Sequence, residues 1–180
     1  MSPHVVWREA VSEHRRWLLL NTIVIAAVVN AVLNALIAWG SAASEDEIPL
    51  LAVPFVEGPS LITDTVGTFF ILPFLTTLVI TTTVWHELRE GRIARLSKRT
   101  VGLLARLPRT RVRRGAYFGA ITALVLSPPA VLILALRDPG DVSVGDFVLF
   151  KAIFGVVLGA IVTPLIALAA MTDEPPPKPE

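Results

Sequence analysis

Four long apolar segments separated by polar connections dominate the hydropathy pattern of this chain. A bilayer hydrocarbon core about 30 Å thick is crossed by about 20 apolar residues in a helix that rises about 1.5 Å per residue. Each of the four segments is at least that long, so each is predicted to form one transmembrane helix. They occupy residues 17–39, 61–85, 115–136 and 147–171.

The first apolar segment also has some features of a cleavable signal peptide. Basic residues precede it, and small residues follow it at 41–43. A signal peptide, however, has an apolar region of about 7 to 15 residues. The segment from Trp17 to Trp39 contains 23 residues without a charge, and we therefore predict an uncleaved helix.

The pattern predicts an all-α, polytopic membrane protein built as a four-transmembrane-helix bundle over residues 17–171. An N-terminal interfacial segment, 1–16, precedes the bundle, and a tail rich in proline and charge, 172–180, is expected to be disordered. Composition agrees, since 53% of the residues are hydrophobic. The chain has no cysteine, which excludes disulfides, thiolate metal sites and cysteine nucleophiles.

Charge is divided unequally between the two ends of the predicted helices. The N-terminal stretch, the connection between the second and third spans and the C-terminal tail sum to +7, and the other two connections with the adjoining helix ends sum to −6. Short cytoplasmic connections carry the excess of lysine and arginine in membrane proteins. We therefore expect a multi-pass protein of the plasma (inner) membrane with both termini in the cytoplasm.

The connection from 88 to 114 is predicted to contain an amphipathic interfacial helix on the cytoplasmic side. Apolar residues from Ile93 to Leu107 share one helical stripe, and basic residues share the opposite face. The simplest interpretation is that these charges only set the topology, and the alternatives are lipid sensing and partner docking. Nucleic-acid binding is not expected, because no aromatic residue is interleaved with the basic ones. The residues predicted to contact anionic lipid headgroups are Arg95, Lys98, Arg99, Arg106, Arg109, Arg111, Arg113 and Arg114.

Polar residues within the predicted spans form the candidate site, because such residues are costly in a bilayer and usually face other helices or water. Each also has a simpler interpretation. Asn30 and Asn34 would hydrogen-bond between helices, Asp64 would favour a helix N-terminus, and Lys151 would extend outward to the interface. Asp64 and Lys151 lie at similar depth, and an ion pair between them is the alternative hypothesis to an extended Lys151. The predicted outward-opening polar pocket comprises Asn30, Asn34, Asp64, Thr65, Thr68, Ser127 and Lys151.

Glycine and proline residues within the spans predict how the helices pack and bend. Gly115 and Gly119 form one G-x-x-x-G motif, and Gly155 and Gly159 form another, so close helix packing is expected within or between subunits. Proline removes a backbone donor and bends a helix. The residues expected to bend helices are Pro73, Pro128, Pro129 and Pro164.

Sequence motifs for catalysis are missing from this chain. The three histidines, His4, His14 and His86, lie outside the spans, and there is no H-E-x-x-H, G-x-S-x-G or phosphate-binding loop. We expect no metal, no cofactor and no enzymatic activity. The leading hypothesis is a small permease-like or channel-like protein that acts as a homo-oligomer, and the alternative is a non-transporting accessory or scaffold protein that acts through its basic connection.

Overall fold

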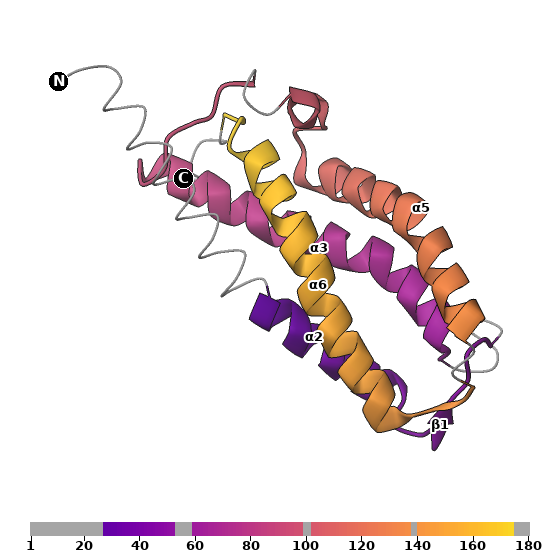
Figure 1. Cartoon of the computed structure of the whole chain (residues 1–180). Helices are drawn as coiled ribbons and strands as arrows, with labels where there is room; N and C mark the ends of the chain where they lie inside the picture. Colours follow the sequence, from indigo (N-terminus) through magenta and orange to yellow (C-terminus); the bar gives the residue numbers. More distant parts are fainter. Residues whose placement is uncertain (1–26, 53–58, 99–101, 138–139, 175–180) are drawn as a thin grey trace.

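The computed structural model describes residues 27–52, 59–98, 102–137 and 140–174 (Figure 1). The interfacial segment 1–16, the first part of the first predicted span, Arg99 and most of the predicted tail lie outside these ranges. The described residues form four α-helices: α2 (Ala27–Ser41), α3 (Leu61–Arg89), α5 (Arg111–Arg137) and α6 (Val144–Ala170). The all-α prediction is thus confirmed, with one short two-stranded ladder in addition.

Three of these helices are long and apolar enough to cross a membrane. Helix α3 has 29 residues, and α5 and α6 have 27 residues each. At about 1.5 Å per residue, each exceeds a hydrocarbon core of about 30 Å. Helix α2 has 15 described residues, which span only about 22 Å. The structure therefore supports three candidate spans and one shorter apolar helix.

Serine residues cap the N-termini of two of the long helices, α3 and α6. The hydroxyl of Ser60 accepts a hydrogen bond from the amide of Thr63 at the start of α3, at 3.3 Å. Ser143 does the same for the amide of Asp146 at the start of α6, at 3.1 Å. Serine at such a position satisfies one backbone donor that the first turn leaves free. Residue Gly91, with φ of 68°, follows the end of α3 in a left-handed conformation that glycine adopts without strain.

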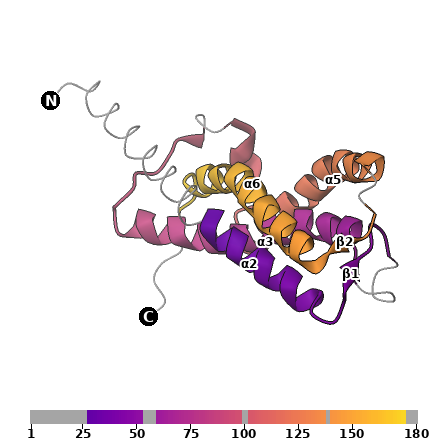
Figure 2. The same cartoon turned by 60° about the horizontal axis from the view of Figure 1, so that its bottom comes forward.

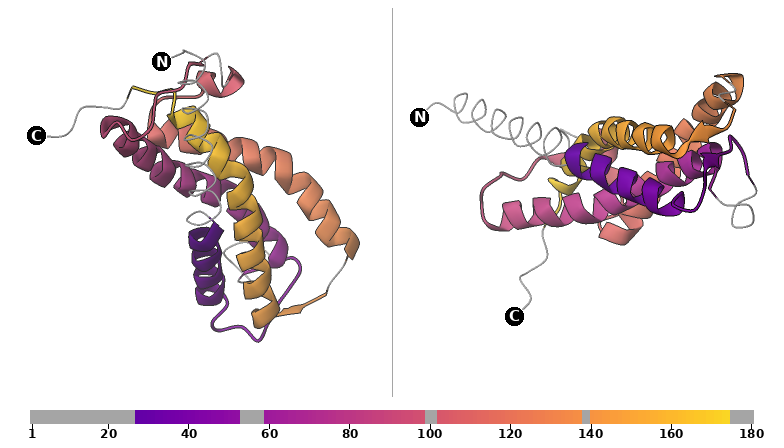
Figure 3. Two further views of the ribbon diagram at one scale, coloured as in Figure 1. Left: turned by 60° about the vertical axis from the view of Figure 1, so that its left-hand side comes forward. Right: turned by 90° about the horizontal axis from the view of Figure 1, so that it is seen from below.

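Helix α6 lies between α2 and α3, and α5 lies against α3 (Figures 1, 2 and 3). At one end of the bundle, β1 (Glu47–Ile48) pairs in antiparallel register with β2 (Val142–Ser143). We call this the ladder end. The opposite end, where the chain leaves α6 after Ala170, is called the tail end. The main buried cluster lies towards the tail end, and a smaller one around Ile48 and Phe147 closes the ladder end.

The connection between α3 and α5 differs from the predicted interfacial helix. Residues 92–97 are not helical, and η2 (Gly102–Arg106) is a short 3-10 helix. The Leu96 amide instead donates to the carbonyl of Met171 at 3.0 Å, and Gly102 has a φ of 56°, so the described residues do not continue one helix. Four residues of the predicted apolar stripe pack against the tail end of the bundle rather than turning away from it: Ile93, Leu96, Leu104 and Leu107.

Candidate functional site

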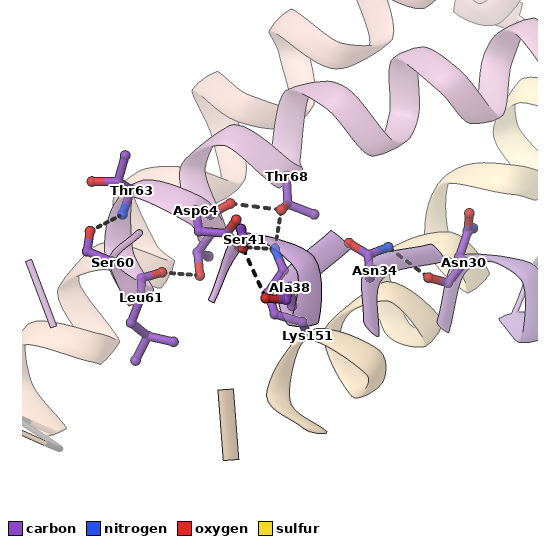
Figure 4. Close-up of polar contacts among 11 residues, drawn as sticks. Asn30, Asn34, Ala38, Ser41, Ser60, Leu61, Thr63, Asp64, Thr68 and Lys151 are labelled. Atoms are coloured by element: carbon purple, nitrogen blue, oxygen red, sulfur yellow. Dashed lines mark hydrogen bonds and ion pairs between the residues drawn. The ribbon is translucent and has the colours of Figure 1, made fainter. Parts of the chain in front are cut away.

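Lys151 lies inside the bundle, near the ladder end of α6, with 1% of its surface exposed. Its amino group contacts a carboxylate oxygen of Asp64 and donates a hydrogen bond to the hydroxyl of Thr68, both on α3 (Figure 4). The Thr68 hydroxyl in turn donates to the backbone carbonyl of Asp64 at 2.8 Å. The structure therefore places Lys151 in an ion pair, and its side chain does not extend to the interface.

Asn30 and Asn34 lie one turn apart on α2, on the side that faces α6 (Figure 4). The Asn34 amide donates to the backbone carbonyl of Asn30 at 2.8 Å. The amide nitrogen of Asn30 is buried and has no hydrogen-bond partner within the described part of the chain. One buried polar group on this face is thus satisfied locally, while the other retains a free donor.

The two glycines of α6 let α2 approach closely. A Cβ atom on Gly155 would lie 2.7 Å from both the Asn30 carbonyl oxygen and the Asn34 amide nitrogen, and one on Gly159 would collide with the amide nitrogen of Asn30. Gly119 on α5 has the same relation to α3, because its Cβ would lie 2.7 Å from the carbonyl oxygen of Phe70. Both glycine pairs therefore lie at helix contacts within one chain.

A groove of about 430 Å³ runs between α2 and α3 and is partly open at the surface. Its polar lining includes Asn30, Asn34, Asp64 and Thr68, four of the seven residues predicted to share a pocket. Lys151 is adjacent, through its contacts with Asp64 and Thr68. The remaining lining is mainly apolar, and several of these side chains are exposed at the surface: Val29, Leu33, Ile37, Ile71, Leu75 and Val79.

Two of the predicted pocket residues lie elsewhere. Thr65 is buried, with its hydroxyl donating to the Leu61 carbonyl at 2.6 Å, and it does not line the groove. Ser127 belongs to α5, which packs against α3, and it is also absent from the lining. Asp64 and Thr68 face α6 instead, so the polar face of α3 is not the face that α5 covers.

The prolines lie within continuous helices. Pro73 is buried in α3, and the Thr77 hydroxyl donates to the Pro73 carbonyl at 2.7 Å. Pro128 and Pro129 are exposed on α5, and Pro164 is half-buried in α6. The Thr77 bond is the common one from a helical threonine hydroxyl to the carbonyl four residues earlier, and the carbonyl that loses its amide donor at Pro73 is that of Phe69.

A second buried ion pair, which was not predicted from the sequence, lies at the tail end. Arg114 is 1% exposed and Asp173 is 6% exposed, and their side chains meet at 2.8 and 2.9 Å. The indole nitrogen of Trp85 donates to the same carboxylate at 3.1 Å, and the guanidinium also donates to the Pro108 carbonyl at 2.9 Å. We refer to Trp85, Arg114 and Asp173 as the Arg114 cluster.

The Arg114 cluster corrects two predictions. Arg114 was expected to contact lipid headgroups, but its charge is buried against Asp173. Thr172 and Asp173 were expected to begin a disordered tail, but both are buried, because hydrogen bonds fix them to the ends of α3, α5 and α6. One feature of the sequence could have predicted this pair. Arg114 immediately precedes the third predicted span and Asp173 closely follows the fourth, so both residues lie at the same end of the bundle.

The other described residues that were predicted to contact headgroups are exposed. Among them, Arg95 donates to Glu174 and to the Thr172 carbonyl, and Arg111 donates to the Thr82 hydroxyl. The hydrogen bond from Arg95 lowers the pKa of the Glu174 carboxyl. Exposure of the charged groups is compatible with headgroup binding at Arg95, Lys98, Arg106, Arg109, Arg111 and Arg113.

Within the described ranges, no group of three or more histidine or acidic side chains is placed to hold a metal ion. Comparison of the chain with protein-family models, with curated proteins and with solved structures finds no match.

Proposed function

We propose that this chain is an integral membrane protein with four spans and its tail end in the cytoplasm. Three long apolar helices and the exposed apolar side chains of α2 and α5 support insertion. The excess of arginine and lysine at the tail end supports the orientation. Because the number of spans is even, both termini lie in the cytoplasm, and the inner membrane is the compartment that the charge distribution favours.

Within that membrane protein, we propose that the groove between α2 and α3 is the solute site of a small permease-like or channel-like protein that acts as an oligomer. The observation that carries this proposal is the partly open groove of about 430 Å³ with six polar residues on its lining, four of which were predicted from the sequence. Small-molecule sites have volumes of about 300–1,000 Å³, with mostly apolar linings and a few convergent polar groups. The groove has both properties.

The ion pair of Lys151 with Asp64 also supports a functional site at the groove. An ionisable side chain within a membrane is costly, and it usually marks a pathway or a functional site. The Lys151–Asp64 pair lies beside the groove, and Asp64 lines it with 21% of its side chain exposed. The pair therefore supplies polarity to the groove without adding net charge.

Cysteine labelling tests the proposal, because the natural chain has no cysteine. Single variants Asn34→Cys and Thr68→Cys should react with a membrane-impermeant thiol reagent added from the ladder-end side of sealed vesicles. Thr77→Cys, which is 0% exposed and outside the groove, is the unreactive control, and Gly40→Cys is the exposed control. If Gly40→Cys reacts and both groove positions remain unlabelled, water does not reach the groove and the solute site is refuted.

The second candidate function is a non-transporting scaffold that works through the basic connection. The exposed arginines at 106, 109, 111 and 113 favour it, because they surround the anchored Arg114 at one end of the bundle. This alternative predicts that neutralising these arginines abolishes function, whereas changes at Asn34 or Thr68 leave function intact. Cells that express either the arginine variants or the Asn34 and Thr68 variants at equal levels would distinguish the two functions, because only one set should lose function.

A further inference from the structure

The two walls of the groove combine polar and apolar side chains, and the α2 wall places Asn34 and Asn30 beyond the level of the Lys151–Asp64 pair, towards the tail end. Towards the ladder end its lining contains Thr63, Asp64 and Thr68 from α3. Farther along α3 the lining becomes mainly apolar, through Leu72, Leu75, Val79 and Ile80, with Thr76 as the exception. The part of α3 from Thr63 to Ile80 extends about 25 Å at about 1.5 Å per residue. Since the buried polar lining and the exposed apolar lining are both extensive, a ligand that fits this groove combines polar groups with an apolar chain.

The sides of the groove indicate where such a ligand enters. Leu33 and Ile37 on α2 and Ile71, Leu75 and Val79 on α3 line the groove and are also among the exposed large apolar side chains. In a bilayer, exposed apolar side chains between two helices face lipid chains and not water. An apolar chain could therefore move from the bilayer into the groove without crossing water.

The charges around the groove favour a ligand without net charge. The negative charge of Asp64 is balanced by the positive charge of Lys151, with which it forms an ion pair, and the other polar lining residues are neutral. An additional charged group would leave one charge uncompensated in a region of low dielectric. A neutral headgroup avoids that cost.

Asn30 provides an unused hydrogen bond. It lines the groove and is 7% exposed, and its amide nitrogen is buried without a hydrogen-bond partner in the described part of the chain. A buried donor that lacks a partner is destabilising, and native proteins usually satisfy such donors. The amide nitrogen lies against Gly159 on α6, so a carbonyl or hydroxyl oxygen of a ligand would satisfy it once the Asn30 side chain has rotated towards the groove.

We propose, on the basis of the solute site described above, that the groove binds a neutral single-chain amphiphile that enters sideways from the bilayer. Its chain lies against the exposed apolar side chains of the two walls, and its ester, amide or hydroxyl oxygens bind near the buried Asn30, Asn34 and Thr68. The groove volume of about 430 Å³ favours one chain over a two-chain lipid.

The test measures protection of a cysteine in the groove. Leu33→Cys lies on the lining, and Val32→Cys next to it lies outside the lining, while the native side chains are similarly exposed at 46% and 51%. Each full-length variant is reconstituted in phosphatidylcholine vesicles and treated with N-ethylmaleimide, which crosses membranes. The probe 1-oleoylglycerol should slow labelling of Leu33→Cys about tenfold and leave Val32→Cys unchanged. Oleate, oleylamine and glycerol should protect neither position.

Different outcomes separate the ligand class from the solute site itself. Protection of Leu33→Cys by glycerol, oleate or oleylamine, but not by 1-oleoylglycerol, overturns the neutral amphiphile and retains a solute site. Absence of protection by every compound overturns both. Equal protection of Val32→Cys shows general lipid contact and overturns the amphiphile site. Slow labelling that disappears on diluting the protein in lipid shows that a second copy of the chain fills the groove, which also overturns it.

A variant of Asn30 tests the hydrogen bond separately. Asn30→Leu keeps a side chain of similar size but removes the amide, and it should weaken protection by 1-oleoylglycerol roughly fivefold to tenfold. Thr82→Val, on an exposed part of α3 outside the lining, is the control that should not change protection. If Asn30→Leu folds and retains full protection, the Asn30 amide does not bind the ligand.

Discussion

The Arg114 cluster allows a direct prediction of stability, because both members of its ion pair are buried. In Asp173→Leu, the guanidinium of Arg114 retains its hydrogen bond to the Pro108 carbonyl but loses both contacts with the carboxylate. The indole nitrogen of Trp85 also loses its acceptor. Removing one partner of a buried pair costs about 3–5 kcal/mol, because the other charge stays buried and uncompensated. We expect Asp173→Leu to lower the free energy of unfolding by that amount.

The double variant Arg114→Leu/Asp173→Leu separates the buried charge from other effects of substitution. Apolar side chains of similar volume often replace a buried ion pair at little cost. The double variant should therefore be more stable than Asp173→Leu alone. Arg113→Leu is the matched control, since Arg113 is the exposed neighbour of Arg114 in the sequence, and a surface substitution usually changes stability by no more than about 0.5 kcal/mol.

Unfolding by sodium dodecyl sulfate in mixed micelles, followed by far-ultraviolet circular dichroism, measures these differences. Two results would refute the reasoning. One is a cost of Asp173→Leu no larger than that of Arg113→Leu. The other is a double variant destabilised by the full sum of its two single changes, since additivity indicates that the two residues do not interact.

Three further predictions follow from the other contacts. Lys151→Asp should destabilise the bundle by about 3–5 kcal/mol, and adding Asp64→Lys should recover part of the loss in the same unfolding assay; a double variant no better than the single change would show that the pair does not contribute. Gly119→Ala should cost about 1–3 kcal/mol through contact with the Phe70 carbonyl, whereas Gly67→Ala, which meets nothing within 4 Å, should be neutral or stabilising by up to about 1 kcal/mol. The contact with Arg95 lowers the pKa of Glu174. This contact therefore stabilises the fold fully at a pH above the ordinary carboxyl pKa, and the stabilisation is lost as the pH falls through the lowered pKa. NMR titration should show a higher pKa of Glu174 in Arg95→Gln, and an unchanged pKa would contradict the assignment.

Residues that face a neighbour through a regular helical spacing could be predicted from the sequence. Asn30 and Asn34 recur one turn apart, as do Gly155 and Gly159, and the structure places these two sets against each other. The ion pair of Lys151 with Asp64 also agrees with their equal predicted depth. The spacing of residues along one helix and their depth in the bilayer were sufficient for these two predictions, because both can be read from each predicted span separately.

Predictions that depended on which helices are neighbours were less successful. Ser127 has suitable depth and polarity, but α5 packs on α3 away from the groove, and nothing in the sequence specifies that arrangement. The stripe from Ile93 to Leu107 was predicted to be the lipid-facing side of an interfacial helix, whereas four of its residues pack against the bundle and the segment is not one helix. Arg113 and Arg114 are neighbouring residues of the same type. Which of them is buried depends on how the first turn of α5 is oriented against the bundle, and the structure buries Arg114.

The position of α6 explains why a groove exists at all. Helix α2 approaches α6 closely at Gly155 and Gly159, and α3 is joined to α6 by Lys151. Helix α2 packs mainly on α6, and α3 packs on α5 and α6, while α2 and α3 have few contacts with each other, so a groove remains between them. An occupant of that groove would contact α2 and α3 at once and would add interactions between two helices that otherwise meet mainly through a third. Because a ligand that binds only the folded state stabilises it by mass action, the groove ligand should raise the stability of α2 more than that of α5, which does not line the groove. Hydrogen exchange of the backbone amides in the two helices, with and without 1-oleoylglycerol, measures this difference, and equal protection of α2 and α5 would argue against binding between α2 and α3.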